Sequence, residues 1–189
     1  GSGEGRGNGF NGFSVMLQEQ HRMDPEISQW PNKRFYQGRL LDAECVRQGT
    51  RSLDLSGFAG LPLGPYTLVD VSEEYGRQYC ESGAVKVGTS LSNSAEAKLA
   101  ALLVSRVLRD GKATSDGVAV ITFYSGQVSL IKSELREAGV EGVPVSSVDG
   151  FQGAEREMVV LSFVRGHGCM GVGFLKDFRR LNVASPGSR

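Results

Sequence analysis

The sequence has 189 residues, of which 40% are hydrophobic, so it is long enough for one domain with a substantial core. Its 21 basic and 21 acidic side chains balance, which excludes a chain-wide basic surface for nucleic acid but leaves room for a local one. The three cysteines, Cys45, Cys80 and Cys169, are far apart and odd in number, so they argue against a disulfide framework or a zinc cluster and fit a reducing compartment.

The N-terminal residues 1–12 are rich in glycine. We expect a flexible segment or the remnant of an expression tag there, followed by one domain over residues 13–189. We expect no signal peptide and no membrane span, because no apolar run is long enough.

The apolar run Phe13–Leu17 predicts a first strand. Asp24 and Pro25 suit the N-cap and the first turn of a helix. We expect that helix over Glu26–Trp30, because Pro31 would interrupt it.

The next part of the chain has a weaker pattern. Leu41–Leu63 has scattered glycines and no clear period, which is typical of a connection over the surface. Pro65–Val71 predicts a strand, and the polar stretch Ser72–Leu91 predicts a loop.

Asn93 begins a strongly periodic segment. It is a good N-cap, and Glu96 three residues later predicts a capping box. Apolar residues at helical spacing follow as far as Leu108, and Gly111 predicts the end of this packing helix.

Residues 117–139 predict a buried strand and a second helix. Gly117–Tyr124 is apolar almost throughout, as expected of a buried strand. Ser125 then predicts the cap of a helix over Gly126–Ala138, with Gly139 as its stop.

The stretch Val143–Arg165 reads as strand, polar turn, strand. Val143–Val148 and Met158–Val164 are the strands, and Asp149–Glu157 is the turn between them. Because strands alternate with helices, we expect an α/β fold with a mostly parallel sheet and helices on both faces. In open α/β sheets ligands bind beyond the carboxyl ends of the strands, which would make this turn a binding site; an ordinary charged turn is the alternative.

Four segments in chain order carry a family resemblance: Gln20–Pro25 (QHRMDP), Ile121–Gln127 (ITFYSGQ), Ser147–Gly153 (SVDGFQG) and Arg179–Ala184 (RRLNVA). Together they resemble the second, C-terminal motor domain of superfamily 1 helicases, in the branch that includes the nonsense-mediated decay helicase and senataxin. The resemblance implies a RecA-like fold of the P-loop NTPase type.

The nucleotide site implied by the resemblance includes Gln20, Arg22, Gly153 and Glu155. Arg22 would be catalytic, reaching across an inter-domain cleft to the γ-phosphate of ATP bound with Mg²⁺ in the full-length protein. A guanidinium suits that place because its charge is fixed and its planar fork matches phosphate oxygens. We expect Glu155 near the ribose; a surface ion pair is the alternative reading of Arg22.

The resemblance also implies contacts with single-stranded RNA or DNA. They come from residues at the carboxyl ends of two predicted strands and in the turn beyond: Thr122, Tyr124, Ser147, Asp149 and Gln152. A core position at a strand end is the alternative for Tyr124. Weaker candidates, for coupling or internal ion pairing, are Gln127, Arg179 and Arg180.

Two features of the sequence separate the function hypotheses. No Gly-x-x-x-x-Gly-Lys-Ser/Thr loop occurs, so the cradle for nucleotide phosphates is absent. The family usually continues after Ala184 with threonine and arginine, where this chain has Pro186 and Gly187. The first hypothesis is therefore a motor half that needs its missing N-terminal RecA-like domain to hydrolyse ATP, so that the isolated chain is inactive.

The second hypothesis is a non-catalytic scaffold of helicase descent that binds nucleic acid or docks a protein. An unrelated small-molecule α/β enzyme fits least, because neither of the two histidines has a recognisable nucleophile context. Under the first two hypotheses we expect the nucleus or the cytoplasm, and no membrane or metal partner of the chain itself.

Overall fold

The computed structural model describes residues 16–48, 53, 55, 63–69, 71, 85–151 and 153–164. Three parallel strands form its main sheet, in the order β6-β5-β7. The strands are β5 (Val118–Thr122), β6 (Val145–Ser147) and β7 (Met158–Ser162). β5 is preceded by the short 3₁₀ turn η2 (Ser115–Gly117), and all five of its residues are buried because it has a partner on each side.

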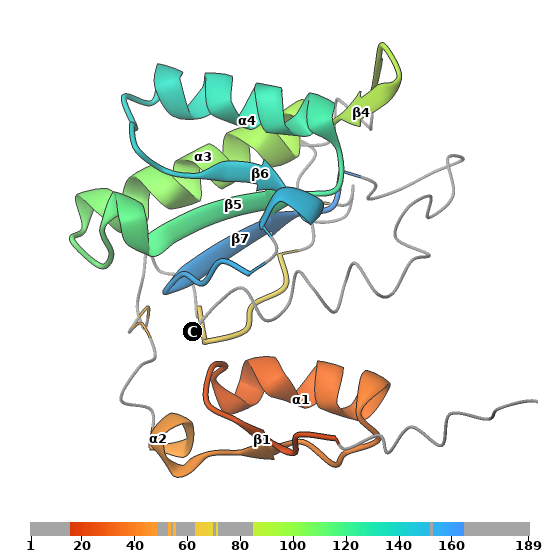
Figure 1. The fold of residues 1–189 in the computed structure, drawn as a ribbon. Helices are drawn as coiled ribbons and strands as arrows, with labels where there is room; N and C mark the ends of the chain where they lie inside the picture. The colour runs from red at the N-terminus through yellow and green to blue at the C-terminus, as the bar shows by residue number, and fades with distance from the viewer. Residues whose placement is uncertain are drawn as a thin grey trace, which may run out of the picture.

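Two long helices, α3 (Ser94–Arg109) and α4 (Ser125–Glu137), cover one face of this sheet (Figure 1). Val118 and Val120 pack against them. On the opposite face, Ile121 packs with Phe151 of the 3₁₀ turn η3 (Asp149–Phe151). The predicted α/β class with a parallel sheet is confirmed; within the described residues, both long helices lie over the same face.

A second, smaller group of elements lies at the N-terminal end of the described chain (Figure 1). Strands β1 (Glu19–Gln20) and β2 (Leu41–Asp42) pair in parallel, and helix α1 (Pro25–Phe35) connects them. The short helix α2 (Glu44–Arg47) follows. Of the predicted strand at Phe13–Leu17, residues 13–15 lie outside the described ranges, and Met16 and Leu17 are not in a strand; pairing begins only at Glu19.

Helix α1 confirms its predicted start and corrects its predicted end. The Asp24 side chain accepts a hydrogen bond from the Glu26 amide at 2.9 Å. Pro31 lies inside the helix, which continues to Phe35. Proline removes one helical hydrogen bond, but its ring is fully buried here. Asn32, directly after it, exchanges two hydrogen bonds with the Leu40 backbone, at 2.7 and 2.9 Å. These tertiary contacts offset the local cost.

The weakly patterned middle of the chain was predicted least well. The connection expected over Leu41–Leu63 contains β2 and α2. No strand forms in the described part of Pro65–Val71. Tyr66, Leu68 and Val69 are all exposed there, so the segment has no buried face that would fix a register.

The loop expected over Ser72–Leu91 contains a hairpin instead. Its strands are β3 (Val85–Val87) and β4 (Ser90–Ser92), joined by the two residues Gly88 and Thr89. Gly88 has a φ of 60°, a conformation that two-residue hairpin turns require and that glycine adopts without strain.

The capping box predicted for α3 forms only in part. Asn93 caps the helix by accepting from the Glu96 amide at 3.1 Å. The Asn93 amide, however, donates to Gln127 Oε1 at 2.8 Å, and the Glu96 carboxylate turns toward the end of β7. The predicted stop at Gly111 is confirmed by its φ of 64° just after the helix.

The cap predicted for α4 was placed one residue too late. Ser125 is the first residue of the helix, and Tyr124 is its N-cap without a side-chain hydrogen bond. The Gly126 amide donates instead to the hydroxyl of Ser90 in the hairpin, at 3.0 Å. No helix in the described part of the chain is long and apolar enough to cross a membrane.

Candidate functional site

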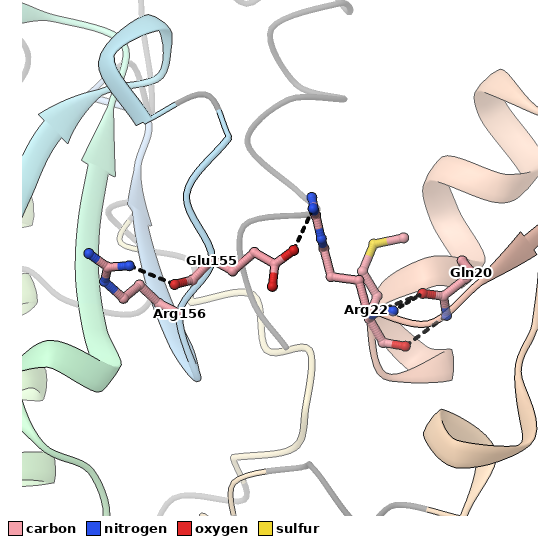
Figure 2. A network of polar contacts seen from close by, with 5 residues as sticks. Gln20, Arg22, Glu155 and Arg156 are labelled. Atoms are coloured by element: carbon pink, nitrogen blue, oxygen red, sulfur yellow. Dashed lines mark hydrogen bonds and ion pairs between the residues drawn. The ribbon is translucent and has the colours of Figure 1, made fainter.

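The turn that carries Arg22 is shaped by a single buried amide, that of Gln20. Gln20 Oε1 accepts hydrogen bonds from the amides of Arg22 and Met23, at 2.9 and 2.7 Å. Gln20 Nε2 donates to the Met23 carbonyl at 2.8 Å and to Asp42 Oδ1 at 2.6 Å. These four bonds use the whole hydrogen-bonding capacity of the side chain. Gln20 therefore fixes the backbone from which Arg22 projects (Figure 2).

Arg22 meets Glu155 across the two groups of elements. Arg22 Nη2 lies 2.5 Å from Glu155 Oε1, and Figure 2 shows the two side chains extended toward each other. Both were predicted from motifs at opposite ends of the sequence. The side chains are 42% and 27% exposed. An ion pair this accessible to water stabilises the fold by only about 0–1 kcal/mol. The ion pair that was the alternative reading of Arg22 thus exists, and its partner is the other predicted nucleotide ligand.

The loop that presents Glu155 is anchored by its neighbours. Arg156 Nη1 donates to the Glu155 carbonyl at 2.7 Å, and the Arg156 guanidinium carbon lies 6.0 Å from the centre of the Phe151 ring. Gly153 has a φ of 84°, and a Cβ built on it would have no atom within 4 Å. A left-handed backbone, rather than lack of space, therefore favours glycine at this exposed position.

The predicted strand contacts at the end of β5 are buried. Thr122 is 0% exposed and Tyr124 4% exposed. The Thr122 carbonyl accepts from the Val148 amide at 3.0 Å, while its hydroxyl has no hydrogen-bond partner among the described residues. The core position left open for Tyr124 is the one that the structure has. In this conformation neither side chain is presented to solvent, and their contact with nucleic acid stays a prediction.

The remaining predicted strand contacts surround η3. The Ser147 hydroxyl accepts from the Gly150 amide at 3.3 Å, which closes the turn after β6. Asp149 is exposed directly beyond it. Three predicted residues lie outside the described ranges: Gln152, Arg179 and Arg180.

Sequence reasoning missed a polar junction between α3, α4 and β7. Gln127, fully buried, exchanges two hydrogen bonds with the Asn93 backbone, at 2.8 and 3.1 Å, and donates a third to Ser162 at 3.1 Å. Glu96 Oε2 accepts from the Ser162 hydroxyl at 2.7 Å and from the Val164 amide at 2.9 Å. The only signal was the Asn93–Glu96 spacing, which also fits a capping box.

Val164, at the end of that junction, has an unusual backbone. Its φ is 70°, which is a genuine outlier for a β-branched residue. Asn93 Nδ2 donates to its carbonyl at 3.3 Å, so Asn93 and Glu96 hold both of its backbone polar groups. The junction thus determines the direction in which the chain leaves β7.

The described residues contain no cluster of three or more histidine, cysteine, aspartate or glutamate side chains that could hold a metal ion. Arg22, half-exposed beside a glycine-bearing turn, does suit a phosphate group, and Glu155 suits a hydroxyl donor. The site offers ligands for a nucleotide rather than for a bare cation.

A parallel sheet flanked by helices, with polar groups gathered beyond its carboxyl edge, defines an α/β domain of the RecA-like, P-loop NTPase type. The chain belongs to the AAA domain family, whose model matches residues 7–185.

Curated relatives agree with that assignment. The chain is 36% identical over 179 residues to DNA polymerase alpha-associated DNA helicase A of Schizosaccharomyces pombe, covering 89% of this chain and 26% of that protein. It is 33% identical to ATP-dependent helicase NAM7 of Saccharomyces cerevisiae (89% and 17%) and 36% identical to Helicase SEN1 of the same yeast (92% and 8%). The resemblance to helicases predicted from the motifs is confirmed, and the chain spans about a quarter or less of each of these relatives.

Proposed function

We propose that this chain is the C-terminal motor half of an ATP-dependent superfamily 1 helicase that acts on RNA or DNA. In this proposal it needs a first RecA-like domain, which supplies the phosphate loop that the sequence lacks. The observation that carries the proposal is the Arg22–Glu155 contact, because it gathers two motif residues, far apart in the sequence, at one exposed place.

The roles of the two side chains follow from their chemistry. Arg22 contributes a fixed positive charge for phosphate oxygens, and Glu155 contributes an acceptor for a ribose hydroxyl. Without nucleotide, each masks the other; the weak, half-exposed pair opens at little cost. When bound, ATP with Mg²⁺ supplies the phosphoryl group. Gln20 acts by holding the Arg22 turn, since its amide has no hydrogen-bonding capacity left for a ligand.

The proposed grip on a single strand centres on the turn after β6. Asp149 is exposed there, and an ionised carboxylate accepts hydrogen bonds from sugar hydroxyls or base amino groups but repels phosphates. Ser147 supports that turn through Gly150. Thr122 and Tyr124, buried directly beneath it, act by shaping the turn unless they become exposed when the strand binds.

The test is strand-stimulated ATP hydrolysis by the full-length protein. Arg22→Ala is expected to lower turnover by about three to five powers of ten if the guanidinium stabilises transition-state charge. Arg22→Lys keeps the charge but loses the fork, and should recover only part of the loss. Arg109→Ala removes an equally exposed arginine from the end of α3 and should change nothing.

Glu155→Gln separates nucleotide binding from turnover. If Glu155 binds ribose, the variant should raise KM for ATP more than it lowers kcat. Turnover unaffected by Arg22→Ala would contradict the motor assignment. It would favour the second candidate, a non-catalytic nucleic-acid-binding or docking scaffold, which is motivated by Pro186 and Gly187 where the family has threonine and arginine. Either candidate would work in the nucleus or the cytoplasm, where scattered cysteines such as those of this chain stay reduced.

A further inference from the structure

The C-terminal end of α1 and the turn after it carry a cluster of exposed cations and an exposed aromatic ring. We call it the basic–aromatic surface: Trp30, Lys33, Arg34 and Arg39. Trp30 is 44% exposed, and Lys33 and Arg34 follow it at helical spacings of three and four residues, which place all three on one side of the helix. No acidic residue occurs between Gln29 and Leu41.

This surface is held in shape by the turn beneath it. The Tyr36 and Gly38 amides both donate to the Asn32 carbonyl, at 3.1 Å, and the Asn32 side chain is bonded twice to Leu40. The residues between, including Arg39, are therefore folded back against the helix end. A surface fixed in advance loses less conformational entropy when it binds a ligand.

The aromatic ring is also fixed. The Trp30 and Phe35 ring centres lie 5.4 Å apart in an edge-to-face arrangement, and the Arg34 guanidinium carbon lies 6.0 Å from the Phe35 centre. Phe35 thus supports both the indole and a cation. The indole remains partly open to a second planar group.

The helix dipole alone does not account for this cluster. Cations are favoured in the last turn of any helix, and α3 also ends with two, Arg106 and Arg109. There, however, Arg106 is paired with Asp110 at 2.8 Å. Lys33 and Arg39 make no ion pair within the described part of the chain.

We propose that the basic–aromatic surface binds single-stranded nucleic acid, as a contact separate from the turn after β6. A base would stack on the Trp30 indole, and neighbouring phosphates would meet Lys33, Arg34 and Arg39. Charge complementarity favours this occupant: the chain has no net charge, yet this segment is uniformly basic. The inference rests on the proposed function only for the class of ligand.

Trp30 makes the inference directly testable, because it is the only tryptophan of the chain. Labelled oligothymidylate and oligouridylate are titrated into the 189-residue protein, and oligonucleotide anisotropy and Trp30 fluorescence are followed together. Binding at the proposed surface quenches the tryptophan along the same curve as the anisotropy. A duplex of the same length should quench less, because its bases are not free to stack.

The variants separate stacking from charge. Trp30→Ala is expected to weaken binding by about 5- to 100-fold, the usual effect of losing one stacked base. Lys33→Ala with Arg39→Ala should weaken it and reduce the slope of log affinity against log salt by roughly one. Arg109→Ala with Lys112→Ala, which removes two cations from the end of α3, is the matched control and should leave both values unchanged.

Three results would overturn the inference. Anisotropy that rises without tryptophan quenching places the strand elsewhere and leaves the proposed motor function intact. Equal weakening by the α3 control pair indicates unspecific charge attraction. Equal quenching by poly-glutamate marks a site for any polyanion, such as an acidic peptide. Loss of ATP turnover in Arg22→Ala with normal quenching would, conversely, support both proposals separately.

Discussion

Replacing Gln127 by leucine should destabilise the domain strongly, although the two side chains are similar in size. The Gln127 amide is fully buried and makes three hydrogen bonds. Two of its partners keep another bond: the Asn93 carbonyl still accepts from Ala97, and Ser162 still donates to Glu96. The Asn93 amide is left buried without an acceptor.

The expected magnitude follows from that count. A buried, unsatisfied donor costs about 1–3 kcal/mol, and each of the other lost bonds about 1 kcal/mol. The transfer of a leucine side chain from water offsets part of this, at about 1.5–3 kcal/mol for full burial. We expect a net loss of about 2 kcal/mol in the free energy of unfolding, or a Tm lower by about 4–8 °C for a domain of this size.

Urea unfolding followed by circular dichroism measures this loss, provided the m value stays that of the wild type. Gln29→Leu makes the same chemical change at an exposed position of α1 and should stay within about 0.5 kcal/mol. If Gln127→Leu were as harmless as Gln29→Leu, the polar junction would not be holding α4 to α3, and the reasoning would fail.

Two further predictions concern local backbone structure, each read out by the same unfolding measurement. Ser90→Ala should cost about 1 kcal/mol, because it removes the acceptor of the Gly126 amide, whereas Ser125→Ala should be near neutral; the opposite order would restore Ser125 as the cap. Gln37→Gly should stabilise the chain and Gly139→Ala destabilise it, each by about 1 kcal/mol, since both positions have left-handed φ values, 58° and 71°; equal signs would refute the strain argument.

Local chemistry made part of this fold predictable. The apolar run of β5 and the helical period of α3 produced elements close to their expected bounds. The cap at Asp24 formed as predicted because its partner is only two residues away. Signals of this kind require no knowledge of the rest of the chain.

The predictions that failed depended on distant partners. Whether Pro31 ends a helix depends on the burial of its ring and on the bonds from Asn32 to Leu40. The cap of α4 comes from Ser90, in a hairpin that local polarity disguised as a loop. Tyr66 lies in a segment with strand-like composition, but exposed side chains on every part of it leave nothing to pair with a sheet.

The site shows the same division. Arg22 and Glu155 were selected by resemblance to a helicase, and only the fold brings them to 2.5 Å of each other. That Gln20 serves the turn, with all its amide atoms used internally, could not be deduced from its motif. Nor could the sequence reveal that Thr122 ends a fully buried strand.

The contrast between β5 and the short β1–β2 pair has a consequence for the timescale of motion. Amide protons of β5, bonded on both sides and shielded from water, should exchange with deuterium only when the whole domain unfolds. The two-residue ladder of β1 and β2 should release its amides through much smaller openings. The segment bearing Arg22 could then move away from and back to Glu155 many times within one lifetime of the folded sheet, as a part that undergoes repeated domain closure must.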